Sequence, residues 1–393
     1  MKNAATGLAR IPALSYGFRP FFLGAASWAA LAMVLWLGVV TSAWTVAESY
    51  GPVAWHAHEL LFGYVSAVVA GFLLTAIPNW TGRLPVRGGP LLVLFLLWAA
   101  GRIALLAVDW IGLVAAMAVD ALFLIVFALA VIREIVAGRN WRNLKIVALV
   151  TVLAAANIGF HAEVYFDGAP DYSVRAAIAA IIGLIMLVGG RLVPSFTRNW
   201  LVRQGAARLP ASFGGFDITA IVVAGAALAI WVAFPVSTWS GIVLLAAGVL
   251  QAVRISRWVG LPTWREPLVL VLHCGYVFVP FGFLLVGLSI LWPDAISASG
   301  ALHAWTAGAM ALMTLAVMTR ASLGHTGYPL TASITTCVVY AAAIVAAFSR
   351  IAASLLPHLT LDLLLLAAFS WLVAFGGFVI SYGPKLLRAP MSS

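Results

Sequence analysis

Long apolar runs separated by short polar connections make up most of this chain. Each run has about 20 residues, the length that a helix needs to cross the hydrocarbon core of a bilayer. Backbone N–H and C=O groups in lipid must be satisfied within the segment, and the alternating ten-residue strands of a membrane barrel are absent from the sequence. The pattern therefore predicts an all-α, polytopic membrane protein, a bundle of about twelve transmembrane helices.

The connections between the runs are short, and most contain Pro, Gly or Asp, which supports the divisions. The first run is longer than the apolar core of a signal peptide, so it is expected to be a retained helix. We predict a single integral-membrane domain over residues 1–393. Its helices are predicted at residues 20–43, 55–78, 89–108, 110–133, 143–165, 172–194, 217–235, 239–258, 267–291, 297–319, 330–351 and 359–383.

The composition strengthens this interpretation. Hydrophobic residues make up 64% of the chain and charged residues only 9%, whereas about a quarter of the residues of a soluble domain are charged. The formal net charge of +10 would suit a nucleic-acid partner, but the basic residues are spread over many connections without forming a stripe. We therefore predict a lipid bilayer as the surrounding medium and no nucleic-acid partner.

The placement of the basic residues predicts the orientation in the membrane. With the N-terminus inside, the 22 Lys and Arg residues, from Lys2 to Arg388, lie on the inner side with three exceptions. Those three are Arg102, Arg175 and Arg350. Because inner loops of membrane proteins are enriched in Lys and Arg, both termini are predicted to be cytoplasmic.

The segment WHAHE, which begins at Trp55, precedes the charge-free run from Leu60 to Pro78. Ionisable groups at such a segment are costly and mark a candidate functional site. On a regular helix His56 and Glu59 share a face, whereas His58 lies about 200° round from His56. Either the two histidines serve different sites or the first turn of this helix is irregular.

Further histidines lie at comparable depths on other predicted helices. His161 and His303 join His56 and His58 near the outer ends of their helices, whereas His273 and His325 lie toward the inner side. Imidazole is a common ligand of copper, iron and haem iron, so the outer set predicts a metal or haem site. The alternative is that individual histidines only cap helices or bond to carbonyl oxygens.

One arginine is predicted to lie inside the membrane. Arg102 is in the run LLWAAGR, below the outer end of its helix. An arginine so placed needs an acidic partner or a wet cavity. The sequence offers Asp109, Asp120, Glu59 or the acid group of a cofactor.

Several motifs together resemble the NnrS family of membrane proteins. They are RPFFLGAASWAAL, WHAHELLFGY, GFLLTAIPNWTG, GGRLVPSFTRN, LHCGYVFVPFGFLL and MTRASLGHTGYPL, and they occur in this order over nearly the whole chain. The resemblance implies a twelve-helix protein of the bacterial inner (cytoplasmic) membrane that contains haem and copper. It also implies a role in nitric oxide metabolism, denitrification and defence against nitrosative stress.

The resemblance also implies site residues. The family's motif histidines carry over to His56, His58, His273, His303 and His325, and His161 stands where a family histidine is expected. No CxxCH attachment motif and no cluster of cysteines occurs, so the haem is expected to be non-covalent haem b. Electrons would have to come from a quinol or a redox partner protein.

The resulting hypothesis is a protein that binds nitric oxide and reduces or detoxifies it, as an oxidoreductase similar to nitric oxide reductases would. We assign His58 and His303 to the axial positions of haem and Arg102 to a haem propionate. His56 is assigned to copper, and Glu59 to proton delivery as a catalytic carboxylate. The alternatives are non-catalytic binding of nitric oxide or metal, and a transporter that handles copper or haem.

Overall fold

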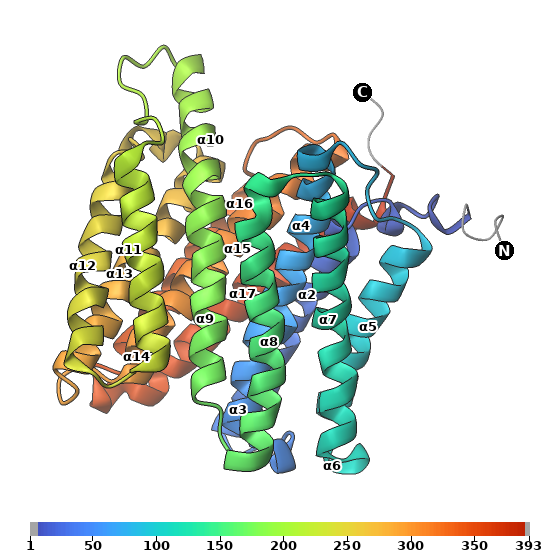
Figure 1. Ribbon diagram of the computed structural model, residues 1–393, viewed down its shortest axis with the longest axis vertical. Helices are drawn as coiled ribbons and strands as arrows, with labels where there is room; N and C mark the ends of the chain where they lie inside the picture. Colours follow the sequence, from blue (N-terminus) through green and yellow to red (C-terminus); the bar gives the residue numbers. More distant parts are fainter. Residues whose placement is uncertain (1–6, 390–393) are drawn as a thin grey trace. The chain divides into compact units, whose positions relative to one another are not determined.

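The computed structural model describes residues 7–389 and is built from helices and their connections (Figure 1). Within those residues no strand is present. Twelve helical stretches within residues 7–389 are long and apolar enough to cross a membrane. The predicted all-α fold with twelve transmembrane helices is confirmed.

The crossing stretches follow the predicted order along the chain. In the N-terminal half they consist of α2 (Phe18–Val40), α3 (Pro52–His58) with η3 (Glu59–Val65) and α4 (Ser66–Thr81), α5 (Gly89–Leu106), α7 (Leu113–Ala137), α8 (Leu144–Asp167), and α9 (Tyr172–Leu184) with η5 (Ile185–Gly189) and α10 (Gly190–Arg203). In the C-terminal half they consist of α11 (Gly215–Ala233), α12 (Thr238–Ser256), α13 (Pro267–Leu291), α14 (Ala298–His303) with η7 (Ala304–Met310) and α15 (Ala311–Thr326), α16 (Ile334–Ala352) and α17 (Thr360–Leu387).

Three of these stretches contain a π-helical segment, namely η3, η5 and η7. A π-helix pairs residue i with i+5 instead of i+4, so it changes the direction in which the following side chains point. Such segments are rare and are frequently found at functional sites. The segment η3 begins at Glu59, directly after the histidines of WHAHE.

Two helices extend well beyond their predicted ends. The predicted end at residue 194 was wrong because α10 continues through Pro194 to Arg203, and the predicted end at residue 319 was wrong because α15 continues to Thr326. The apolar length needed to cross lipid says nothing about a helix that continues into polar sequence. His325, which follows the predicted helix end at residue 319, consequently lies in the last turn of α15.

The contacts divide the chain into two compact units. Unit 1 contains the chain up to Ala177 together with Met318–Leu330 and the residues from Phe375 onward, and unit 2 contains Ile178–Val317 and Thr331–Ala374. The single integral-membrane domain and the cytoplasmic position of both termini stay predictions. Lys2, which contributed to the predicted orientation, lies outside the described residues.

Glycines permit close helix packing in both units. In unit 2, a Cβ at Gly241 of α12 would lie 2.7 Å from Cγ of Leu291 on α13. In unit 1, a Cβ at Gly101 of α5 would lie 2.7 Å from Oδ1 of Asp120 on α7. Because small residues let helix backbones approach each other, Gly101 brings α5 against α7 and places the adjacent Arg102 beside the Asp120 carboxylate.

Candidate metal centre

The two histidines of WHAHE have different neighbours, as their spacing predicted. The His56 ring stacks on Trp36 of α2, with ring centroids 4.3 Å apart and planes at 20°. His58, the last residue of α3, is completely buried and faces polar groups of α8. The divergence follows from the 100° that separates successive residues on a helix.

Glu59 does not take the direction that a regular helix predicted. Its carboxylate was expected on the His56 face, but Oε1 lies 3.2 Å from Nδ1 of His58 and Oε2 accepts a hydrogen bond from Arg102. The backbone stays α-helical at Glu59, whose N–H bonds to the Trp55 carbonyl oxygen, so it is the long side chain itself that reaches His58 and Arg102. Glu59 therefore belongs to the surroundings of His58.

His58 is held at both ring nitrogens. Nε2 lies 2.8 Å from Oδ1 of Asn157 on α8 and 3.2 Å from Oδ2 of Asp120 on α7. The Asn157 amide nitrogen donates to the same Asp120 oxygen at 3.0 Å, so its oxygen faces His58. Since Nδ1 faces Glu59, both nitrogens point at acceptors, and a doubly protonated imidazolium satisfies this arrangement.

Arg102 joins the two carboxylates of this cluster. Its side chain is buried on α5, and its two terminal nitrogens donate to Glu59 Oε2 and Asp120 Oδ1. The predicted need for an acidic partner is met by two of the four proposed candidates. Asp109, a third candidate, instead bonds to the turn that contains Ser49.

His161 completes the cluster from one turn further along α8. Its Nε2 lies 2.9 Å from Oδ2 of Asp120, and its ring stacks on that of His58 with centroids 4.8 Å apart. Its Nδ1 lies 2.9 Å from the hydroxyl of Tyr50, which is 1% exposed. Burial raises the pKa of Tyr50 well above its usual value, and the nearby Asp120 and Glu59 carboxylates add to the shift. Tyr50 is therefore a neutral phenol that donates to His161, whose Nε2–H donates to Asp120.

Charges balance within the cluster. The two carboxylates, Glu59 and Asp120, face the Arg102 guanidinium and the His58 imidazolium, and His161 is neutral in this hydrogen-bonding pattern. A buried charge that loses its partner is costly, typically by about 3–5 kcal/mol. Each member is therefore held by the others, and the residues form one closed network.

The donor set fits a transition-metal ion. One ligand atom each from His58, Asp120 and His161 lies within 4.8 Å of the others, and all three residues are buried. Two imidazoles and a carboxylate suit copper, iron or zinc. Metal binding would displace protons from the coordinating nitrogens, because ligands coordinate in their deprotonated form. Arg102, Glu59, Asn157 and Tyr50 then surround the ligands and orient them.

The remaining predicted histidines lie elsewhere. His273 and His303 belong to unit 2, where Nε2 of His273 lies 2.7 Å from the Thr197 hydroxyl and Nδ1 of His303 lies 2.6 Å from the Ser299 carbonyl oxygen. A carbonyl oxygen only accepts, so Nδ1 of His303 is the donor, and a neutral ring keeps its lone pair on Nε2. That is the tautomer that a metal or haem ligand needs. His325, in unit 1, packs its ring 5.4 Å from that of Phe18.

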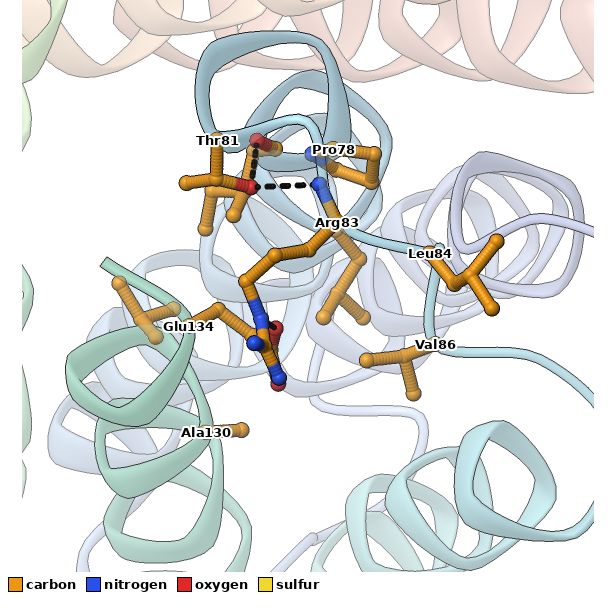
Figure 2. A pocket seen from close by; sticks show the side chains of 10 residues that line it. Pro78, Thr81, Arg83, Leu84, Val86, Ala130 and Glu134 are labelled. Carbon is orange, nitrogen blue, oxygen red and sulfur yellow. Dashed lines mark hydrogen bonds and ion pairs between the residues drawn. The ribbon is translucent and has the colours of Figure 1, made fainter. Parts of the chain in front are cut away.

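A small pocket elsewhere in unit 1 lies apart from this chemistry (Figure 2). It lies between α4 and α7, where Arg83 Nε donates to Glu134 Oε2 at 2.6 Å and Thr81 accepts from the Arg83 backbone. Its volume of about 10 Å³ has room for about one water molecule. We interpret this region as a structural contact, in which the Arg83–Glu134 ion pair links the end of α7 to the connection between α4 and α5.

Three residues of the cluster were missing from the residues assigned to the site by sequence. Asp120 and Asn157 are polar residues in otherwise apolar runs, a signal that predicts a proton path or an interhelical hydrogen bond but does not say which site they join. Tyr50 gave a weaker signal, since a tyrosine in the connection before a helix is commonplace. Only the fold brings its hydroxyl, 111 residues away in sequence, to His161.

The comparison with known proteins agrees with the motifs in the sequence. No curated protein matches this chain. The family model described as NnrS protein matches residues 12–389, which is nearly its full length and includes every residue of the cluster. On the strength of that match, the chain belongs to the NnrS family.

Proposed function

We propose that this protein binds nitric oxide at a buried metal centre in the bacterial inner membrane and removes it by reduction. Membership of the NnrS family supports a nitric-oxide-related role for a multi-pass membrane protein. The observation that carries the proposal is the cluster of His58, His161 and Asp120, which combines a donor set for a redox metal with buried carboxylates.

Copper would be held by His58, His161 and Asp120, and haem b by His303. This revises the axial pair His58 and His303 that the helix geometry suggested, because His58 lies with Asp120 and His161 in a three-residue donor set for a single ion. It also moves copper away from His56, whose ring packs on Trp36. When bound, these groups would supply coordination of nitric oxide and electron transfer.

The chain's own residues would orient the centre and handle protons. Arg102 fixes the positions of the Glu59 and Asp120 carboxylates, and Asn157 keeps the His58 ring in place. Glu59, 3.2 Å from Nδ1 of His58, would accept and return a proton at that nitrogen. Full burial excludes bulk water and strengthens these electrostatic interactions.

The overall reaction determines how many electrons and protons must be supplied to the centre. Reduction of two nitric oxide molecules to nitrous oxide and water takes up two electrons and two protons. The electrons would come from a quinol or a redox partner protein. Holding both diatomic molecules at one centre would make their reaction effectively intramolecular.

A second candidate function is binding of nitric oxide or copper without turnover. The closed network favours it, because every carboxylate and both histidines of the cluster already have partners within the protein. A centre of this kind could sequester a ligand while offering no path for further reaction.

Anaerobic nitric oxide consumption by the detergent-purified chain, supplied with a quinol analogue, separates the two functions. Optical spectra and metal analysis of the same preparation establish what is bound. Asp120→Asn should abolish consumption, whereas the exposed Asp362→Asn should leave it unchanged. A metal-loaded wild-type protein that binds nitric oxide but never consumes it would leave binding without turnover as the function.

A further inference from the structure

A short turn between α2 and α3 brings Tyr50 to the cluster. This turn, η2 (Glu48–Tyr50), is preceded by Ala47 with φ 50° and followed by Gly51 with φ 86°. Glycine accepts a positive φ freely, whereas alanine disfavours the left-handed conformation. Contacts with the surrounding structure must therefore stabilise the turn.

Asp109 supplies these contacts from the short helix α6 (Val108–Ile111). Its Oδ2 accepts from the backbone N–H of Glu48 at 3.1 Å, and its Oδ1 accepts from the backbone N–H of Ser49 at 2.8 Å and from the Ser49 hydroxyl at 2.6 Å. Hydrogen bonds to an ionised carboxylate are roughly twice as strong as neutral ones. A single side chain thus fixes the first two residues of the turn.

The third residue of the turn enters the cluster. Tyr50 is almost completely buried, and its ring lies edge-on to those of His58 and His161, each at a centroid distance of 5.9 Å. Its hydroxyl contacts Nδ1 of His161, the nitrogen opposite to the one that faces Asp120. The phenol therefore fixes the rotation of the His161 ring. Because a hydroxyl can also accept a hydrogen bond, it can receive the Nδ1–H when Nε2 gives up its proton to bind a metal ion.

We infer that Asp109 is a positioning residue for the metal centre, acting through the turn Glu48–Tyr50 and the contact of the Tyr50 hydroxyl with His161. The inference rests on the proposed function in so far as it takes His161 as a metal ligand. Groups that orient a metal-binding histidine typically contribute about 10–100-fold to metal affinity. Asp109 does this without touching any ligand, and its whole effect passes through Tyr50.

A double-mutant cycle on the full-length protein tests this path. Copper affinity is measured by competition with a chelator for the wild type, Tyr50→Phe, Asp109→Ala and the double variant, with Asp167→Ala as an exposed control near the same ends of the helices. Tyr50→Phe should weaken copper binding about 10-fold, and Asp109→Ala by a similar factor. The double variant should be no weaker than Tyr50→Phe alone, because both changes remove the same contact.

Two outcomes of the double-mutant cycle, and one of the control, would overturn the inference. One is an unchanged copper affinity in Asp109→Ala; the other is a double variant weakened by the product of the two single effects, about 100-fold, which is the signature of independent action. The control Asp167→Ala should bind copper like the wild type. Affinity changes of equal size in the control would also contradict a specific role for Asp109.

A second measurement needs no metal. In metal-free protein, the rate at which diethyl pyrocarbonate modifies His161 is followed by mass spectrometry, and it should rise in both Tyr50→Phe and Asp109→Ala. A rate unchanged in Asp109→Ala would contradict the inference even if wild-type protein bound no copper. Absence of nitric oxide consumption alongside the expected affinity cycle would instead count against the proposed function alone.

Discussion

Two segments of the molecule present a histidine in the same local backbone pattern. His58 directly precedes the π-helix η3 and His303 directly precedes the π-helix η7, and each π-helix has seven residues. A glycine follows five residues later in both, Gly63 and Gly308. The first segment belongs to unit 1, and the second, up to Val317, to unit 2.

The surroundings of the two histidines differ sharply. Both nitrogens of His58 face side chains from other positions in unit 1, including the carboxylate of Asp120. Nδ1 of His303 instead faces a backbone carbonyl of its own helix, that of Ser299. The backbone pattern presents the ring, and the groups around it decide whether it is held between polar side chains of other helices or bonded to its own helix.

The largest expected effect follows from removing the guanidinium of Arg102, which pairs with Glu59 and Asp120 in the cluster around His58. Arg102→Leu leaves two buried carboxylates short of a partner and should lower the free energy of unfolding by about 3–5 kcal/mol. Arg350→Leu removes only a hydrogen bond to the Ser299 hydroxyl near His303 and should cost about 1 kcal/mol or less. Thermal unfolding in detergent measures both.

Arg102→Lys provides a matched control for this comparison. A lysine keeps the charge but cannot span two carboxylates with a planar fork, so its loss should be intermediate. If Arg102→Leu proved so unstable that no folded protein were recovered, the yield of folded Arg102→Lys would still rank the variants. Equal losses for Arg102→Leu and Arg350→Leu would contradict the difference between the two segments.

A second prediction tests the metal that each of the two segments is proposed to hold, copper at the His58 cluster and haem at His303. His161→Ala should reduce bound copper to background while haem remains, because His161 belongs to the His58 cluster. His303→Ala should remove haem and leave copper in place. Metal analysis measures the bound copper, and the optical spectrum measures the bound haem, in the purified variants.

His56→Ala tests the same assignment against the one that helix geometry suggested. The His56 ring packs on Trp36, so its loss should leave copper bound. Loss of copper from His56→Ala with retention in His161→Ala would restore the original assignment of His56 to copper.

The fold could be predicted from the sequence to a large extent. Lipid demands long apolar segments with internally satisfied backbones, and this demand is visible in the sequence as twelve runs. It does not extend beyond the lipid, which is why the ends of α10 and α15 were predicted too early. It also gives no signal for a π-helix such as η3, or for the direction in which the long Glu59 side chain reaches, toward His58 and Arg102.

The site could be predicted only in part. The cost of an ionised group in lipid identified His58, Glu59 and Arg102 and required an acid for the arginine. Which acidic residue pairs with Arg102 depends on packing between helices, because Asp120 and Glu59 lie 18 and 43 residues away from it in the sequence. No periodicity within one helix encodes such contacts, so Asp120 was only one candidate among several.

A third prediction concerns the glycine inside each π-helix, five residues after the histidine: Gly63 in η3 and Gly308 in η7. A Cβ at Gly63 would lie 2.6 Å from Nη1 of Arg102, and one at Gly308 would lie 2.3 Å from Cδ1 of Phe278. Overpacking of this kind should cost about 1–3 kcal/mol in both Gly63→Ala and Gly308→Ala. Only Gly63→Ala should also weaken copper binding, since only it displaces a member of the network. Copper binding reduced equally in both would contradict the comparison.

The smallest expected effect concerns the residues directly before α3 and α14, the two helices that end at His58 and His303. The turn before α3 is held by Asp109, whereas α14 is capped by Ser297, whose hydroxyl oxygen accepts from the Gly300 N–H at 3.1 Å. Partial burial tends to raise the pKa of Asp109, but hydrogen bonds from Ser49 and Glu48 outweigh it and lower the pKa below its usual 3.8. The Ser297 hydroxyl has no charge to lose in this range.

The sign of the pH dependence follows from the lowered pKa. Because the folded protein favours ionised Asp109, the stabilisation is fully present above pH 3.8 and is lost as the pH falls through the lowered value. Asp109→Ala should therefore lower the free energy of unfolding at pH 7 by about 1 kcal/mol or less for so exposed a group, and the difference from wild type should shrink below pH 3.8. Ser297→Ala should cost about 1 kcal/mol at both pH values. A difference for Asp109→Ala that stays constant down to pH 3 would mean that packing, and not the charge of the carboxylate, holds the turn beside His58.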